Sequence, residues 1–112
     1  MLGEQKKTVA MNTQILENIR SLKRQLIPNE RLILFGSQAR GDAHPGSDWD
    51  LLLLLNDSQN KQDYEDRIFD FVLMGWKYGT YLSIMPYTEK EWEIRKPSIL
   101  YQNIKNEGVE IQ

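Results

Sequence analysis

Residues 31–55 read RLILFGSQARGDAHPGSDWDLLLLL, and this stretch decides the fold. It contains two short apolar runs, 31–35 and 51–55, and each run is bounded by turn-forming residues, which predicts two buried strands. Five leucines in a row would also suit a helix. The run is short, however, and acids and turn residues flank it, so a central strand with both faces buried fits better. Between the strands we predict a helical turn over 38–40 and a loop over 42–47.

The segments on both sides of this stretch have helical patterns. Apolar residues recur every three or four positions from about Thr8 to Leu26 and again from Asp63 to Tyr78, which predicts two amphipathic helices. The other predicted elements are a strand over 80–87, helices over 89–95 and 98–107, and a terminal strand over 109–111. This alternation predicts the α/β (α+β) class: a small mixed β-sheet with helices packed against it.

Length and composition limit the protein class. The 112 residues are 40% hydrophobic and 27% charged, with a net charge of −2, so we expect one globular domain over 8–112 after a disordered tail over 1–7. There is no cysteine and His44 is the single histidine, which excludes thiolate and multi-histidine metal sites. The slightly acidic balance makes direct nucleic-acid binding unlikely to be the function. Without an apolar run of ~20 residues or a signal peptide, we expect a cytoplasmic protein that does not bind membranes.

The dipeptide Gly36-Ser37 directly follows a predicted buried strand. Glycine has no Cβ, so the backbone at this point can approach a ligand closely. If residues 38–40 start a helical turn, the amides around Ser37 would face an anion such as phosphate. An ordinary strand-to-helix turn also uses glycine and serine, so the dipeptide alone is a weak indication of a phosphate site.

Asp48 and Asp50 lie two residues apart at the start of the leucine strand. Side chains alternate along a strand, so the two carboxylates share a face and Trp49 takes the other. Carboxylates this close repel unless a cation lies between them, and Mg²⁺ is commonly held by one or two carboxylates plus substrate phosphates. Two solvated surface aspartates are the alternative. The apolar run that follows places the acids at the mouth of a core and favours the metal site.

Taken together, residues 36–41 and 47–51 resemble the G-S-x-A-R-G and S-D-x-D-L signature of minimal nucleotidyltransferases, within the polymerase-beta-like superfamily. The resemblance implies the nucleotidyltransferase fold, with Mg²⁺ (or Mn²⁺) as cofactor and ATP or another nucleoside triphosphate as substrate. The implied reaction moves a nucleoside monophosphate, often AMP, to a hydroxyl on a partner protein or small molecule. The site residues implied are Gly36, Ser37, Arg40 and Ser47 for the phosphates, and Asp48 and Asp50 for metal and catalysis.

One part of the family pattern is missing. Catalytic members carry a third carboxylate on a neighbouring strand, which completes a two-metal site. The predicted strand over 80–87 has no acid, and Ser83 is the expected occupant of the third-ligand position. Asp57 and Glu89 are nearby acids without motif support. A catalytically weak or inactive nucleotide-binding or partner-binding module therefore remains the alternative to an enzyme.

The resemblance also implies a partner. Small relatives of this kind accompany a HEPN-type helical protein in toxin–antitoxin pairs, where they are the antitoxin. A chain of 112 residues lacks the extra domains with which larger relatives hold an acceptor. We therefore expect such a partner, or a second copy in a homodimer, to supply the acceptor site.

Overall fold

The computed structural model describes residues 2–112, with side chains described from Thr13 onward. In chain order the helices and strands are α1 (Leu2–Leu26), β1 (Arg31–Phe35), α2 (Ser37–Arg40), β2 (Trp49–Leu55), the 3-10 turn η1 (Lys61–Tyr64), α3 (Glu65–Lys77), β3 (Leu82–Thr88), α4 (Glu89–Ile94), α5 (Ile99–Glu107) and β4 (Val109–Ile111). The helix α1 begins earlier than the predicted start at Thr8. The division into a tail over 1–7 and a domain over 8–112 stays a prediction.

The four strands form one mixed sheet in the order β3-β2-β1-β4. Strand β1 runs antiparallel to both β2 and β4, whereas β2 and β3 run parallel. The predicted fold class is confirmed, and the leucine run lies in β2, one of the two inner strands. Its two neighbours satisfy the backbone hydrogen bonds of β2 on both sides, which allows a fully apolar segment to be buried there.

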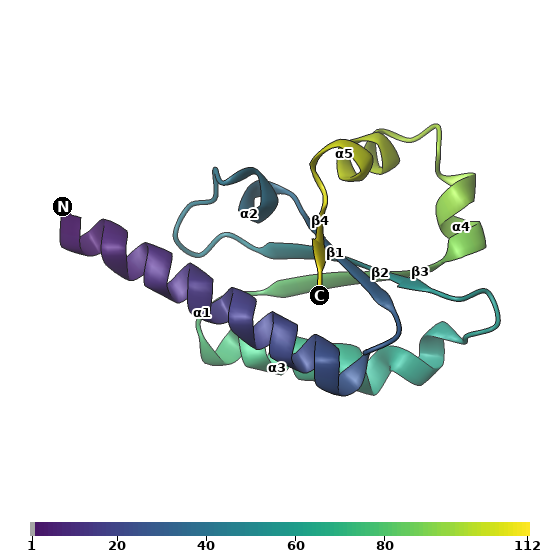
Figure 1. The fold of residues 1–112 in the computed structure, drawn as a ribbon, viewed down its shortest axis with the longest axis horizontal. Helices are drawn as coiled ribbons and strands as arrows, with labels where there is room; N and C mark the ends of the chain where they lie inside the picture. The colour runs from purple at the N-terminus through teal and green to yellow at the C-terminus, as the bar shows by residue number, and fades with distance from the viewer. Residues whose placement is uncertain (1) are drawn as a thin grey trace.

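Helices cover both faces of the sheet (Figure 1). On the face of α1 and α3, Leu51, Leu53 and Leu55 pack in one core with Ile19 and Phe71 among others. On the face of α4 and α5, Leu52 and Leu54 pack in a second core with Trp92 and Ile104. Alternating leucines therefore serve two different cores, which explains why the run has no polar face.

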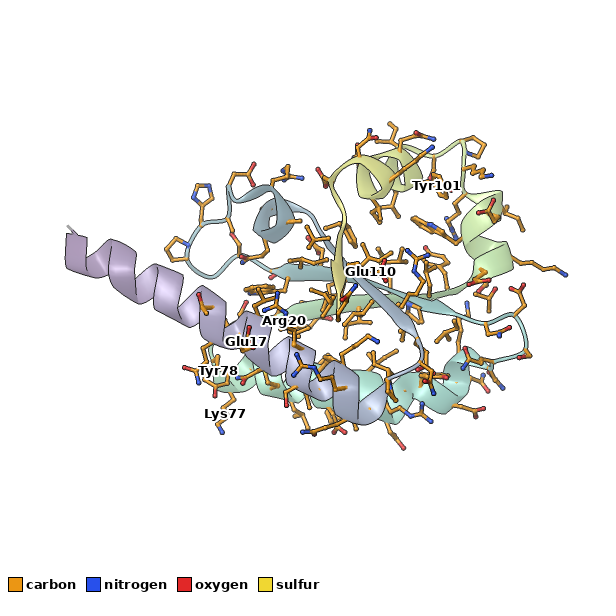
Figure 2. All side chains as sticks on the ribbon, in the orientation of Figure 1. Glu17, Arg20, Lys77, Tyr78, Tyr101 and Glu110 are labelled. Atoms are coloured by element: carbon orange, nitrogen blue, oxygen red, sulfur yellow. The ribbon has the colours of Figure 1, made fainter. Side chains whose placement is uncertain are left out.

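The second core is closed by aromatic contacts. The ring of Tyr101 on α5 (labelled in Figure 2) packs at a tilt against Trp92 on α4, with 4.9 Å between ring centroids. The ring of Tyr87 on β3 packs against the same indole, with 5.6 Å between centroids. These contacts join the two short helices to each other and to the sheet. They hold α5 above β1, from where the chain descends into β4 (Figure 1).

Apolar side chains of helix α3 lie on both its buried and its exposed side. Phe71 and Gly75 are buried, while Phe69, Leu73 and Trp76 are 51%, 44% and 57% exposed. Both sets have helical spacing, so periodicity alone does not distinguish them. The ring of Phe69 packs edge-on against Trp76, with 6.2 Å between centroids, on the outer surface.

Among the described residues, no helix combines the length and apolarity needed to cross a membrane.

Candidate functional site

The residues singled out from the sequence gather at one end of the sheet. Because β1 and β2 run antiparallel, the carboxyl end of β1 meets the amino end of β2, and Phe35 pairs with Asp50. Because β2 and β3 run parallel, the amino end of β3 lies at the same place, and Ser83 pairs with Asp50 from the other side. The turn α2 and the loop over 42–48 connect β1 to β2 above this end.

Gly36 lies directly against the carboxylate of Asp50. A Cβ built on Gly36 would be 2.5 Å from Asp50 Oδ2, well inside any normal contact. The backbone of Gly36 has φ +76° and ψ −158°, a conformation that only glycine adopts readily. The backbone at Gly36 therefore approaches a neighbouring group closely, and that group is the Asp50 carboxylate. Its approach to a phosphate stays a prediction.

The two aspartates are electrostatically coupled. Burial raises the pKa of Asp50 above its ordinary value, the negative charge of Asp48 raises it further, and the positive charge of Arg40 opposes both. Asp50 is half-buried and Asp48 is exposed. A carboxylate made unstable by burial and by a like charge gains from a cation, so these two side chains suit a hard divalent metal.

The segment between Gly36 and Gly41 forms the predicted helical turn. The carbonyl of Gly36 accepts a hydrogen bond from the amide of Arg40 at 3.0 Å, and the turn ends at Gly41 in the left-handed conformation. The first N–H groups of such a turn, including that of Ser37, have no partner inside the turn. They are donors that an anion beside Asp50 could use.

Ser47 organises the loop that leads to Asp48. Its Oγ accepts a hydrogen bond from the His44 amide at 2.8 Å, and its carbonyl accepts from Gln38 Nε2 at 3.3 Å and Thr80 Oγ1 at 3.1 Å. These bonds join the loop to α2 and to the residues before β3. A role of Ser47 in contacting phosphate stays a prediction, whereas its role in placing Asp48 follows from these contacts.

Arg40 is engaged by two acids. Its Nε donates to Asp42 Oδ2 at 3.2 Å, and its Nη1 donates to both carboxylate oxygens of Glu107 at 3.1 and 3.2 Å. These bonds raise the pKa of Arg40, with Asp42 the larger cause. Glu107 also accepts a hydrogen bond from the Gly36 amide at 3.2 Å. Sequence reasoning did not identify Glu107 as a site residue.

A signal for Glu107 exists in the strand register. Leu34 pairs with Val109 across β1 and β4, so extending this antiparallel register by two residues puts Glu107 opposite Gly36. The terminal strand was expected from the sequence, but its partner strand was not. Without the partner, nothing local in the sequence connects residue 107 to the Gly-Ser turn.

Ser83, the expected occupant of the third-ligand position, pairs with Asp50 across β2 and β3. A role of this position in holding metal stays a prediction. The other acids considered lie elsewhere. Asp57 and Glu89 follow the carboxyl ends of β2 and β3. Leu55, the last residue of β2, is five residue steps from Asp50, which is about 16 Å along the strand. Asp57 Oδ1 there accepts a hydrogen bond from the Lys90 amide at 2.8 Å. Across the described residues, no three His, Cys, Asp or Glu side chains are grouped to hold a metal ion.

Comparison with known families and sequences gives two matches. The sequence model of the family described as "Nucleotidyltransferase domain" matches residues 14–108. A segment of 48 residues, 43% of this chain, is 44% identical to the bifunctional uridylyltransferase/uridylyl-removing enzyme of Pseudomonas putida (strain W619). The match spans only 5% of the length of that enzyme, so it concerns a local segment of a much larger protein.

Solved structures share the fold at low sequence identity. A toxin–antitoxin crystal structure with AMP-PNP has a TM-score of 0.58 at 21% identity, covering 87% of this chain and 72% of that one. A proposed nucleotidyltransferase from Sulfolobus solfataricus has a TM-score of 0.57 at 19% identity, covering 91% and 83%. A mutant of the toxin–antitoxin MntA-HpeT has a TM-score of 0.58 at 19% identity, covering 87% and 72%.

Proposed function

The chain belongs to the nucleotidyltransferase domain family, and on that premise we propose that it binds a nucleoside triphosphate with Mg²⁺ and transfers the nucleoside monophosphate to an acceptor hydroxyl. The observation that carries this proposal is the contact between Gly36 and the Asp50 carboxylate, where a Cβ built on Gly36 would lie 2.5 Å from Asp50 Oδ2. It brings the donors of the Gly-Ser turn and the acidic end of β2 to one point. A bound triphosphate needs both features, since its phosphates require donors and its metal requires carboxylates.

Each side chain has a proposed task. Asp48 and Asp50 would hold Mg²⁺ or Mn²⁺, which when bound supplies positive charge to the phosphates and to the leaving pyrophosphate. The amides at Gly36 and Ser37 would bind phosphate oxygens, and Arg40 would add a charged donor. In the reaction, the acceptor oxygen forms a bond to the α-phosphorus, the bond from that phosphorus to the bridging oxygen breaks, and pyrophosphate leaves while the hydroxyl proton passes to water.

We propose ATP as the nucleotide and a separate protein as the source of the acceptor. Two structures of the same fold are toxin–antitoxin complexes, one of them with AMP-PNP. A HEPN-type helical protein is the partner that the motif resemblance suggests, and a second copy of this chain is the other source. The relative with uridylyltransferase activity makes UTP the competing nucleotide to test.

A specific observation also favours the alternative function, a nucleotide-binding or partner-binding module with weak or absent turnover. Ser83 pairs with Asp50 at the position of the third carboxylate, and a serine hydroxyl brings no negative charge. A two-metal site needs more carboxylate than Asp48 and Asp50 provide. The structure therefore supports binding more directly than it supports rapid transfer.

The experiment that tests transfer uses Mg²⁺ with α-labelled ATP or UTP, with and without the protein from the neighbouring gene. Label on an acceptor and release of pyrophosphate are both followed. We expect transfer from ATP in the presence of the partner, lost in Asp50→Asn because that variant removes a metal ligand. Asp57→Asn is the matched control, since Asp57 lies beyond the other end of the same strand.

The outcomes separate the two functions. Transfer that survives Asp50→Asn would place the chemistry elsewhere and contradict the proposed site. Tight, Mg²⁺-dependent nucleotide binding that Asp50→Asn abolishes, without transfer under any pairing, would establish the binding module. No nucleotide binding at all would reject both.

A further inference from the structure

Glu107 accepts hydrogen bonds from two donors of the Gly-Ser turn, the Gly36 amide and the Arg40 guanidinium. One carboxylate oxygen accepts from the Gly36 amide at 3.2 Å, and both oxygens accept from the Arg40 guanidinium at 3.1 and 3.2 Å. A carboxylate that bridges a backbone amide and an arginine makes the contacts that a phosphate makes. The same two donors are the ones assigned to the nucleotide phosphates above.

The position of Glu107 is determined by the backbone around it. Gly108 follows it, and a Cβ at Gly108 would lie 2.5 Å from the Ile104 carbonyl and 2.8 Å from Ile33 Cγ2, so the chain is packed tightly against β1. Val109 then pairs with Leu34 in the first register position of β4. The end of α5 and the start of β4 therefore place Glu107 beside the turn, and its side chain is only 22% exposed.

We propose that Glu107 is an internal competitor of the nucleotide phosphates, which occupies the Gly36 amide and Arg40 in the free protein and is displaced when a triphosphate binds. This inference rests on the proposed function, since it concerns the same donors. Two like charges cannot share these donors at close range, so the carboxylate must move away as the phosphates arrive. Binding then includes the loss of the Glu107 contacts, which lowers the apparent affinity for nucleotide.

The competing role of Glu107 would be to position Arg40 for the phosphate. The two roles make opposite predictions. If Glu107 competes, removing its charge makes the Gly36 amide and Arg40 Nη1 more available, while Arg40 Nε still donates to Asp42, and nucleotide binding tightens. If Glu107 positions Arg40, removing its charge leaves the guanidinium less ordered and weakens binding. A neutral side chain of the same shape therefore distinguishes them.

The test compares the full-length wild type with Glu107→Gln by calorimetric titration of Mg²⁺-ATP, inorganic tripolyphosphate and adenosine. We expect roughly fivefold to tenfold tighter binding of the two phosphate ligands by Glu107→Gln, as one charge-assisted contact is removed from the competing side. Adenosine, which has no phosphate, should bind both proteins alike. Glu110→Gln is the matched control, since Glu110 pairs with Arg31 at 2.8 Å farther along β4 and away from the turn.

A second measurement follows the displacement itself. The backbone amide resonance of Gly36 should shift in Glu107→Gln without ligand, and tripolyphosphate should shift it in the wild type as the carboxylate leaves. Thermal unfolding of each variant shows whether it is folded. Glu107→Asp, which keeps the charge but shortens its reach, should lie between the wild type and Glu107→Gln in affinity.

The results separate this inference from the proposed function. Wild-type binding that Asp50→Asn abolishes but Glu107→Gln leaves unchanged or weakens overturns the competitor role and keeps the nucleotide site. Failure of both the wild type and Glu107→Gln to bind either phosphate ligand overturns the nucleotide site and the competitor role together. A Gly36 resonance that tripolyphosphate does not move while binding occurs also overturns the displacement.

Discussion

The two ends of strand β2 differ in what they bury, apolar side chains at one end and a charged group at the other. At the carboxyl end Leu51 to Leu55 are between 0% and 5% exposed and serve two cores. At the amino end, Asp50 is half-buried beside Asp48, and its pKa is raised by burial and by that neighbour. Burying a leucine side chain stabilises a fold by about 1.5–3 kcal/mol, whereas partly burying a charge destabilises it.

This contrast shows how a small domain can carry an unfavourable site. Burial of the leucines stabilises the fold, and this offsets the cost of holding the Asp50 carboxylate against Gly36 and beside the charge of Asp48. Strand β2 pairs with β1 on one side and with β3 on the other, and its buried leucines determine its register. The strand can therefore tolerate the partly buried charge at its amino end. Removing a leucine side chain at the carboxyl end should therefore lower the stability, whereas removing the charge of Asp50 at the amino end should raise it.

The largest effect is expected from Leu53→Ala at the carboxyl end. Leu53 lies on β2, which pairs with β1 and β3, and its side chain is fully buried in the core under α1 and α3. The variant therefore loses apolar burial and leaves a cavity. We expect a loss of about 2–5 kcal/mol in the free energy of unfolding, measured by urea denaturation. Leu73→Ala is the control, because Leu73 is 44% exposed on α3 and should change stability far less. Equal losses in both variants would contradict the assigned core.

The next effect is expected from Gly36→Ala at the acidic end. Alanine is strained at φ +76° and ψ −158°, and its Cβ would be 2.5 Å from Asp50 Oδ2. We expect a loss of about 1–3 kcal/mol in the free energy of unfolding and the loss of nucleotide binding. Gly79→Ala is the control, because Gly79 has φ +74° but nothing within 4 Å of a built Cβ. The difference between the two variants reports the contact with Asp50 together with the ψ of −158° at Gly36.

Asp50→Asn should act in the opposite direction. Because the pKa of Asp50 is raised in the folded state, the folded protein binds more protons than the unfolded chain in the window from the unfolded pKa up to the folded one. Wild-type stability from this group is therefore present below that window and is lost as pH rises through it. Without metal, Asp50→Asn should be more stable than the wild type above the window and should lack this slope.

Thermal melting from pH 3 to 8 measures the difference. Added Mg²⁺-nucleotide should reverse it. A ligand at about ten times its Kd stabilises the wild type by about 1.4 kcal/mol and leaves the variant unchanged. A variant that melts below the wild type at every pH would show that Asp50 stabilises the folded state and would remove the contrast between the two ends of β2.

The sequence determined most of this contrast in advance. The leucine strand and the turn over 38–40 follow from local pattern, because each depends on residues close in the chain. The motif pointed to Ser83 on a neighbouring strand, and the parallel register with Asp50 came from the structure. Glu107 and the buried face of α3 could not be obtained in this way. Glu107 meets Gly36 only through the pairing of β4 with β1, and α3 has two apolar stripes of equal periodicity, so tertiary packing decides both.

The smallest change in stability is expected from Ser83→Asp, which adds a carboxylate on β3 beside the acidic end of β2. The new carboxylate would lie beside Asp50 in the parallel register, so repulsion should raise the pKa of Asp50 further and lower metal-free stability slightly. Ser83→Asn is the control, because it has the same shape without the charge. With Mg²⁺ and ATP, Ser83→Asp should bind metal more tightly and transfer label faster than the wild type, and Ser83→Asn should not. If Ser83→Asp shows neither tighter metal binding nor faster transfer, position 83 is not the place of a missing third carboxylate. The metal site would then depend on Asp48 and Asp50 alone, with a serine beside them.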